Sequence, residues 1–126
     1  MRAVDTNLLV RLLVRDEPRQ LAAAERFIAS GAWISHIVIV ETMWVLDSVY
    51  ARTAKQIATA IEMLLSHTSL TLQDPEVVAA ALDCYRKHRG VGFSDCLVLE
   101  TARQAGHVPL GTFDNRLMKL EGAQRP

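Results

Sequence analysis

Four acidic residues, Asp5, Glu41, Asp95 and Asp114, stand at positions of the 126-residue chain where chemistry is expected. Asp5 directly follows the first predicted strand, and Asp114 directly follows the fourth. Because ligands of parallel sheets bind beyond the carboxyl ends of the strands, both carboxylates should lie at that rim. Asp95 lies in the first turn of a predicted helix, after a break rich in glycine.

Glu41 is set apart by its apolar neighbours. In the segment VIVETMWVL, residues 38–46, a helix places Ile37 and Val38 one turn before the glutamate and Trp44 one turn after it, on the same face. Burying an unpaired carboxylate costs on the order of several kcal/mol. We therefore predict that Glu41 is a buried metal ligand.

Convergence of the four acids would restrict their chemistry. Two carboxylates about 4 Å apart repel by about 4 kcal/mol at an effective dielectric of about 20, so several need protons or cations to coexist. Oxygen-only ligands select hard divalent ions, Mg²⁺ or Mn²⁺. Such ions can activate a water and neutralise the leaving oxygen of an in-line displacement at a phosphodiester.

Each acid also has an ordinary explanation. Asp5 and Asp114 could cap the helices that follow them, and Asp95 could favour the dipole of its helix. Glu41 could be a neutral, buried glutamic acid. The occurrence of all four at element boundaries on one predicted edge favours a shared site.

Short apolar runs alternate with longer helical patterns, and hairpin signals are absent. This alternation predicts an α/β fold in which helices cover both faces of a parallel sheet, within one domain of residues 1–126. We expect strands at 2–4, 32–35, 70–72 and 108–113. We expect helices at 8–14, 18–30, from 36 through Glu41, 53–66 with Thr53 as cap, 74–88 with Asp74 as cap, 94–105, and 115–120.

Composition excludes several classes of protein. Half the residues are hydrophobic, 22% are charged and the net charge is +0, so a nucleic-acid partner needs a local basic patch or metal ions. Cys84 and Cys96 form no CxxC pair, which indicates free thiols in a reducing cytosol, and the four scattered histidines argue against zinc. Arginines interrupt the first apolar run, and no segment could span a bilayer, so we expect a cytoplasmic protein without membrane contact.

Four stretches together resemble a known family. DTNLLVRLL, SHIVIVETMWVL, GFSDCLVLETA and GTFDNRL look like the acidic motifs of PIN domains, and most of all those of the VapC-like toxins of type II toxin–antitoxin systems. The resemblance covers nearly the whole chain; the ordered set is specific, although no single motif is. It implies an α/β/α sandwich with a central parallel sheet of four to five strands. It also implies an Mg²⁺- or Mn²⁺-dependent endoribonuclease that hydrolyses RNA with metal-activated water.

The resemblance also implies roles for individual residues. Asp5, Glu41 and Asp95 match the principal metal-binding and catalytic acids, and Asp114 matches the fourth. Asn7 and Thr112 match supporting polar positions, although each could equally be an ordinary turn or capping residue.

The chain departs from the family pattern in two places. Cys96 occupies a position that is usually smaller, and we interpret it as a core residue and not as a nucleophile. The short ending EGAQRP leaves open whether a fifth strand forms.

Partners are suggested by basic and apolar residues. Arg11, Arg15 and Arg116 lie near acidic motifs and are the best candidates for RNA phosphates, although ordinary surface charge would also explain them. We expect Trp33 and Trp44 to pack in the core, not to stack on bases. The helix around Glu41 is apolar nearly all round, which suggests a subunit contact. The resemblance implies a homodimer and a small antitoxin that inserts a basic residue among the acids.

Three other functions compete with this hypothesis. A haloacid-dehalogenase-like phosphatase would need a second aspartate where the chain has Asn7. A non-catalytic binding module would be expected to lose some of the acids, and all four are present. A housekeeping RNA-processing PIN nuclease without an antitoxin remains open, and an upstream reading frame for a small DNA-binding protein would separate it from a toxin.

Overall fold

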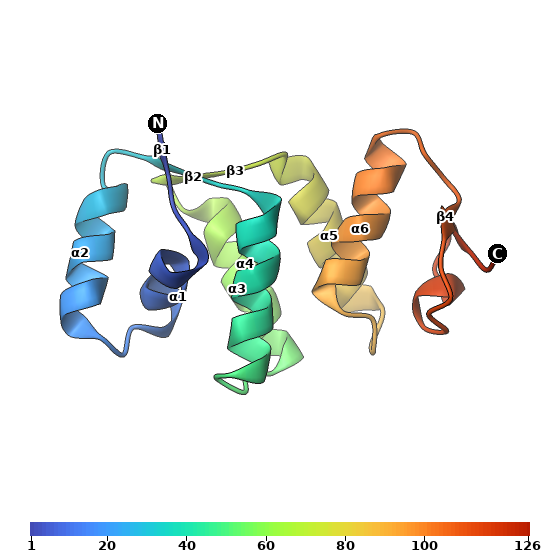
Figure 1. Ribbon diagram of the computed structural model, residues 1–126, viewed down its shortest axis with the longest axis horizontal. Helices are drawn as coiled ribbons and strands as arrows, with labels where there is room; N and C mark the ends of the chain where they lie inside the picture. The colour runs from blue at the N-terminus through green and yellow to red at the C-terminus, as the bar shows by residue number, and fades with distance from the viewer. The chain divides into compact units, whose positions relative to one another are not determined.

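The computed structural model describes residues 1–126, which form two compact units, Met1–Pro75 and Glu76–Pro126 (Figure 1). The first unit contains β1 (Arg2–Ala3), α1 (Thr6–Val14), α2 (Pro18–Ile28), β2 (Ala32–Ile34), α3 (His36–Ser48), α4 (Ala54–Ser66) and β3 (Leu70–Leu72). The second contains α5 (Pro75–Lys87, which begins at the boundary), α6 (Phe93–Gln104), β4 (Leu110–Gly111), the 3₁₀ helix η1 (Leu117–Lys119) and β5 (Ala123–Gln124).

The first unit is built on a parallel sheet with the strand order β1-β2-β3. In the central strand, Ala32 pairs with Arg2 on one side and with Leu70 on the other. Ala32 and Ile34 are fully buried, while Trp33 between them is 37% exposed, as the two-residue period of a strand requires. Parallel neighbours need crossover connections, which are the helix pairs α1–α2 and α3–α4.

The helices of the first unit begin at defined caps. Asp5, Ser35 and Thr53 each accept a hydrogen bond from the backbone N–H three residues later, a contact that contributes about 0.5–2 kcal/mol. Pro18 begins α2 at a position where its missing N–H has no helical partner to lose. The predicted starts at Thr53 and Pro18 are confirmed, and Asp5 marks the point where the chain leaves β1.

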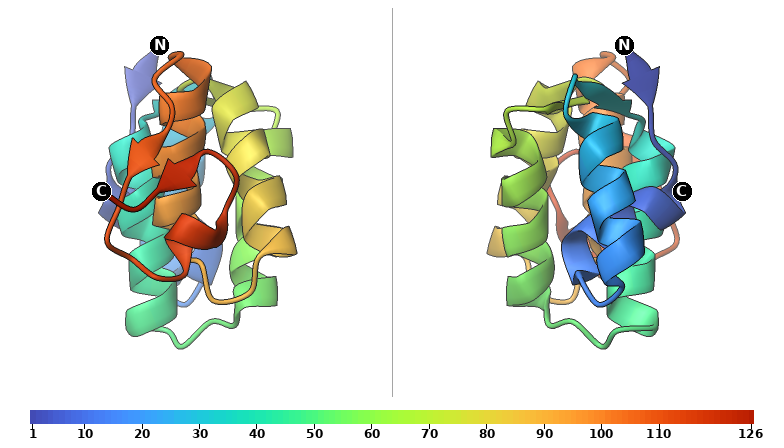
Figure 2. Two further views of the ribbon diagram at one scale, coloured as in Figure 1. Left: turned by 90° about the vertical axis from the view of Figure 1, so that its right-hand side faces the viewer. Right: turned by 90° about the vertical axis from the view of Figure 1, so that its left-hand side faces the viewer.

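The core of the first unit lies between these helices and the sheet. Helix α1 packs against α2 and α3, and α4 packs against α3 and β3. Leu9, Ile39 and Ile61 are completely buried at these contacts. The strands lie at one end of the helices (Figures 1 and 2), so residues just after β1 and β2 lie where their helices begin.

The second unit pairs two helices with a short parallel ladder. Helices α5 and α6 run side by side (Figure 2). The ring of Tyr85 meets that of Phe93 edge-on, at 6.1 Å between centroids. Strand β5 pairs parallel with β4. Arg103 on α6 donates a hydrogen bond of 2.7 Å to the carbonyl oxygen of Glu121, which holds the C-terminal segment. The question left open by EGAQRP is therefore answered, because a fifth strand forms.

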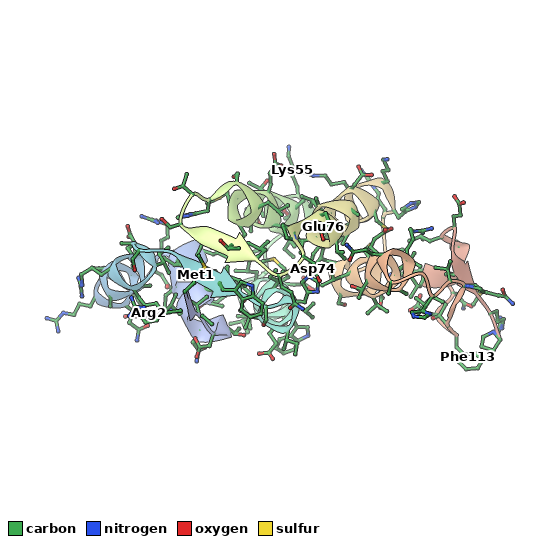
Figure 3. The ribbon with its side chains drawn as sticks, turned by 90° about the horizontal axis from the view of Figure 1, so that it is seen from above. Met1, Arg2, Lys55, Asp74, Glu76 and Phe113 are labelled. Carbon is green, nitrogen blue, oxygen red and sulfur yellow. The ribbon has the colours of Figure 1, made fainter.

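The predicted fold class is confirmed by six helices and parallel strands, three in the sheet of the first unit and two in that of the second. The strand predicted at 108–113 is reduced to Leu110–Gly111, because Pro109 offers no N–H and the chain turns at Thr112. Phe113, placed in that strand by the sequence, is 75% exposed and points outward (Figure 3).

One smaller prediction also needs correction. The closing helix expected at 115–120 is only the 3₁₀ turn η1. Pro75 is the first residue of α5, as predicted, and Asp74 precedes it with a φ of 39°. No helix has the length and apolar character that crossing a membrane requires.

Candidate metal and nuclease site

Asp5 and Glu41 come from neighbouring helices of the first unit. Asp5 follows β1 and caps α1, with its Oδ1 accepting a hydrogen bond of 3.0 Å from the N–H of Leu8. The next residue, Thr6, donates its hydroxyl to Oε2 of Glu41 on α3 at 3.0 Å. A single short hydrogen bond therefore joins Glu41 to the residue beside Asp5. In each carboxylate, the second oxygen accepts no hydrogen bond from the first unit.

The prediction that Glu41 is buried is wrong. Helix α3 buries the face that carries Ile39, Thr42, Met43 and Leu46, and Glu41 lies on the opposite, exposed face. The apolar neighbours of Glu41 on that face are exposed as well. Ile37 is 70% exposed and Trp44 is 65% exposed. Because the helix is apolar nearly all round, the pattern did not reveal which face packs inward.

The expectation that both tryptophans pack in the core is likewise wrong. Trp44 stands one turn after Glu41 on the exposed face, and Trp33 is 37% exposed on the sheet. Their exposure leaves both indole rings available to a partner, and that of Trp44 lies on the same face of α3 as a proposed catalytic acid.

Asp95 is the half-buried acid of the second unit. It lies in the first turn of α6, and no hydrogen-bond donor within its own unit contacts its carboxylate. Burial raises the pKa of Asp95, and the negative charge of Asp114 raises that pKa further. The two acids therefore lie close enough to repel each other, which is the interaction that a cation would relieve.

Asp114 is held by the turn that it forms. Its Oδ1 accepts hydrogen bonds from the backbone N–H groups of Arg116, at 2.9 Å, and Leu117, at 2.8 Å. Thr112 accepts a hydrogen bond of 3.0 Å from the N–H of Asp114, so its hydroxyl shapes the turn. These hydrogen bonds fix the turn before η1, whose N-cap is Arg116, and they use only Oδ1 of Asp114.

Arg116 links the turn of Asp114 to the loop that precedes the helix of Asp95. Its guanidinium donates a hydrogen bond of 3.2 Å to the carbonyl oxygen of Gly90, in the loop that leads into the helix of Asp95. Gly90 has a φ of +87°, and an added Cβ would lie 3.4 Å from Cδ of Arg116. Arg116 therefore has a structural partner that the sequence did not indicate.

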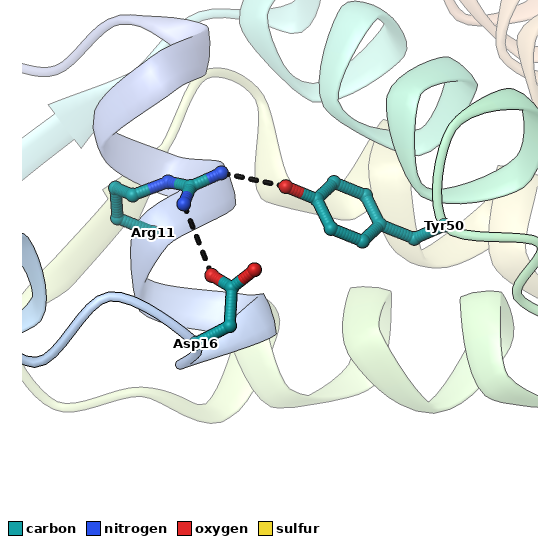
Figure 4. A network of polar contacts seen from close by, with 3 residues as sticks. All are labelled: Arg11, Asp16 and Tyr50. Atoms are coloured by element: carbon teal, nitrogen blue, oxygen red, sulfur yellow. Dashed lines mark hydrogen bonds and ion pairs between the residues drawn. The ribbon is translucent and has the colours of Figure 1, made fainter.

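The other candidate basic residues differ in their availability. Arg11 donates hydrogen bonds to Asp16 at 3.0 Å and to the hydroxyl of Tyr50 at 2.7 Å (Figure 4), and these contacts raise its pKa. Arg15 is exposed and lies 3.9 Å from Glu25. Asn7 is exposed on α1. Of the two arginines, Arg11 is the less free to bind a phosphate.

The cysteines are core residues, as interpreted for Cys96. Cys96 is completely buried and Cys84 is 9% exposed. Burial raises the pKa of both thiols, which disfavours the thiolate that a nucleophile would need.

The acids share a pattern that fits a hard cation. Asp5, Glu41 and Asp114 each have one oxygen fixed by a protein donor and one without a protein donor, and the pKa of Asp95 is raised by burial and by the charge of Asp114. All these donors are oxygens, the set that Mg²⁺ and Mn²⁺ prefer. Neither unit by itself assembles three or more His, Cys, Asp or Glu side chains able to hold a metal ion.

Comparison with known proteins identifies the family. A model of the PIN domain matches residues 2–123, a span that includes all four acids. Comparisons with curated proteins and with solved structures give no match. PIN domains are in general metal-dependent nucleases that act on RNA or DNA. The chain belongs to the PIN-domain family.

Proposed function

We propose that the chain is a metal-dependent endoribonuclease and the toxin of a VapBC-type toxin–antitoxin pair. Its metal-binding and catalytic acids would be Asp5, Glu41, Asp95 and Asp114. The observation that carries the nuclease proposal is the state of these carboxylates. Three of them are each oriented by a protein donor and keep a second oxygen without one, and the pKa of the fourth, Asp95, is raised by burial and by the charge of Asp114.

The four acids would divide the work by their surroundings. A bound Mg²⁺ or Mn²⁺ would supply Lewis-acid activation of water and neutralise charge on the scissile phosphate. Asp5 and Asp114 would present their second oxygens from fixed positions, because Oδ1 of each accepts hydrogen bonds from backbone N–H groups. Asp95 would lose its electrostatic penalty on metal binding, which couples its ionisation to the cation.

Substrate phosphates need further cations. Arg15 and Arg116 are exposed residues near the acidic motifs, whereas Arg11 is engaged by Asp16 and Tyr50. We therefore assign phosphate contacts to Arg15 and Arg116 before Arg11. Thr112 supports the turn of Asp114, and Asn7 is the exposed second residue of α1.

A cleavage assay tests the nuclease proposal. The purified chain is incubated with total RNA and with single-stranded DNA, in Mn²⁺, in Mg²⁺ and in EDTA, and the new ends are mapped. We expect internal cuts in RNA that depend on the metal. Cleavage that persists in EDTA contradicts the metal mechanism, and cleavage of DNA alone contradicts the choice of RNA. Intact RNA with either metal favours a non-catalytic module.

The toxin proposal rests on the ordered motifs, and the exposed apolar face of α3 supports a partner or a homodimer. Induced expression should arrest growth, and co-expression of a small protein encoded just upstream should relieve the arrest. Growth unaffected by an active enzyme favours a housekeeping nuclease.

For the homodimer, light scattering should show a mass of twice 14.0 kDa. A monomer at high concentration contradicts it.

A further inference from the structure

Thr6 is half-buried at the first position of α1, and its hydroxyl donates a hydrogen bond of 3.0 Å to Oε2 of Glu41. We infer that Thr6 is a positioning residue that holds the Glu41 carboxylate ready for the metal. This inference rests on the proposed function, because it concerns one of the proposed ligands. The resemblance to the family pointed to Asn7, one residue later, and not to Thr6.

Glu41 needs such a partner because its own helix supplies none. Its neighbours on the exposed face of α3, Ile37 and Trp44, are apolar and offer the carboxylate little hydrogen bonding. An exposed glutamate side chain has several rotatable bonds and loses substantial conformational entropy when fixed. A metal site binds its ion more weakly when a ligand must first be ordered than when that ligand is already held in place.

Thr6 is suited to the task by its stiffness and by its position. A β-branched side chain has few χ1 rotamers, so the hydroxyl has a defined direction. The backbone of Thr6 is fixed in turn, because Asp5 caps the same helix turn through the N–H of Leu8. Thr6 therefore fixes the Glu41 carboxylate relative to the end of β1 that precedes Asp5.

The hydrogen bond uses one oxygen of Glu41 and leaves Oε1 without a donor in the first unit. A donor to one oxygen restricts rotation of the carboxylate without blocking the other oxygen. The expected effect of Thr6 is therefore on metal affinity, whereas a structural staple between α1 and α3 would act on folding stability. An exposed hydrogen bond contributes little to stability, so the two roles give different results.

The test is calorimetric titration of the full chain with Mn²⁺. Thr6→Val removes the hydroxyl and keeps the branched shape, and Thr6→Ala removes it without adding an apolar branch. Both should weaken Mn²⁺ binding about tenfold or more, as loss of an outer partner of a metal ligand usually does. Their melting temperatures without metal should stay within about 3 °C of the wild type.

Two controls match these variants. Thr6→Ser retains the hydroxyl and should recover most of the Mn²⁺ affinity that Thr6→Val loses. Thr59→Val makes the same chemical change at an exposed helical threonine, whose hydroxyl donates to the carbonyl of Lys55 at 3.0 Å, and should also bind normally. A crystal structure of metal-free Thr6→Val should show the Glu41 carboxylate in more than one conformation.

The outcomes separate this inference from the proposed function. If the wild type binds Mn²⁺ and both Thr6→Val and Thr6→Ala bind it equally well, Thr6 has no positioning role and the nuclease proposal stands. If the variants lose stability and not affinity, Thr6 is only a structural contact. If the wild type binds no Mn²⁺, the proposed metal site and the role of Thr6 are both wrong.

Discussion

The two pairs of acids in this chain are built differently. In the first unit, Asp5 and Glu41 each receive a hydrogen bond, from Leu8 N–H and from the hydroxyl of Thr6. In the second unit, Asp114 is held by its turn, but Asp95 has no donor from its own unit and its pKa is raised by burial and by Asp114. The comparison suggests that the first pair is arranged by donors and that the second keeps an electrostatic strain which a cation would remove.

The largest effect is expected at Asp95. Asp95→Asn should reduce RNA cleavage by more than about 100-fold, because loss of a direct ligand should exceed the 10–100-fold cost of losing an outer one. The metal-free protein should melt at the same temperature or higher, since an unfavourable charge is removed. Cleavage kinetics and thermal denaturation measure the two effects.

Asp83→Asn is the matched control for Asp95→Asn. Asp83 is an exposed acid of the same unit, in an ion pair of 2.9 Å with Lys87, and should matter little to cleavage. Wild-type cleavage by Asp95→Asn would remove Asp95 from the catalytic set.

Glu41 tests whether the first pair also contacts the ion. Mn²⁺ should raise the melting temperature of the wild type more than that of Glu41→Gln, because the amide is a weaker metal ligand and a bound ion stabilises only the folded state. Glu25→Gln, an exposed acid in a 3.9 Å pair with Arg15, should show the full shift. Equal shifts in wild type and Glu41→Gln would mean that Glu41 does not touch the ion.

Arg116 distinguishes arrangement of the second pair from contact with RNA. Arg116→Gln removes a cation assigned to the substrate phosphates, and we expect KM to rise about tenfold, with a steep dependence on salt and little change in kcat. Lys119→Gln serves as the surface control, because Lys119 is an exposed cation at the last position of η1. A fall in kcat with KM unchanged would instead assign Arg116 to the arrangement of the second pair, through its hydrogen bond to Gly90.

The smallest expected effect is the pH dependence of stability. Because the folded pKa of Asp95 is raised, the folded chain holds this proton more tightly than the unfolded chain. The penalty is therefore absent at pH below the ordinary aspartate pKa and complete above the raised value. Without metal, Asp95→Asn should gain melting temperature over the wild type as pH rises through that interval, and the two should coincide at low pH. A gap that widens as pH falls would contradict the sign.

Local patterns in the sequence predicted most of the fold and the identity of the acids. Cap residues and apolar runs located α1 to α4 and β1 to β3, because these signals act between near neighbours in the chain. The predicted burial of Glu41 was wrong, because α3 is apolar on all sides and its sequence does not indicate which face packs against the core. The contacts of Thr6 with Glu41 and of Arg116 with Gly90 span 35 and 26 residues, and such pairings follow only from the folded chain.

Anomalous diffraction from a crystal grown with Mn²⁺ tests the central claim most directly. We expect a manganese peak whose ligands include carboxylate oxygens of Asp5, Glu41 and Asp95, with Asp114 beside them. A peak bound elsewhere, or no peak at Mn²⁺ concentrations that support cleavage, would contradict a metal site made by these acids.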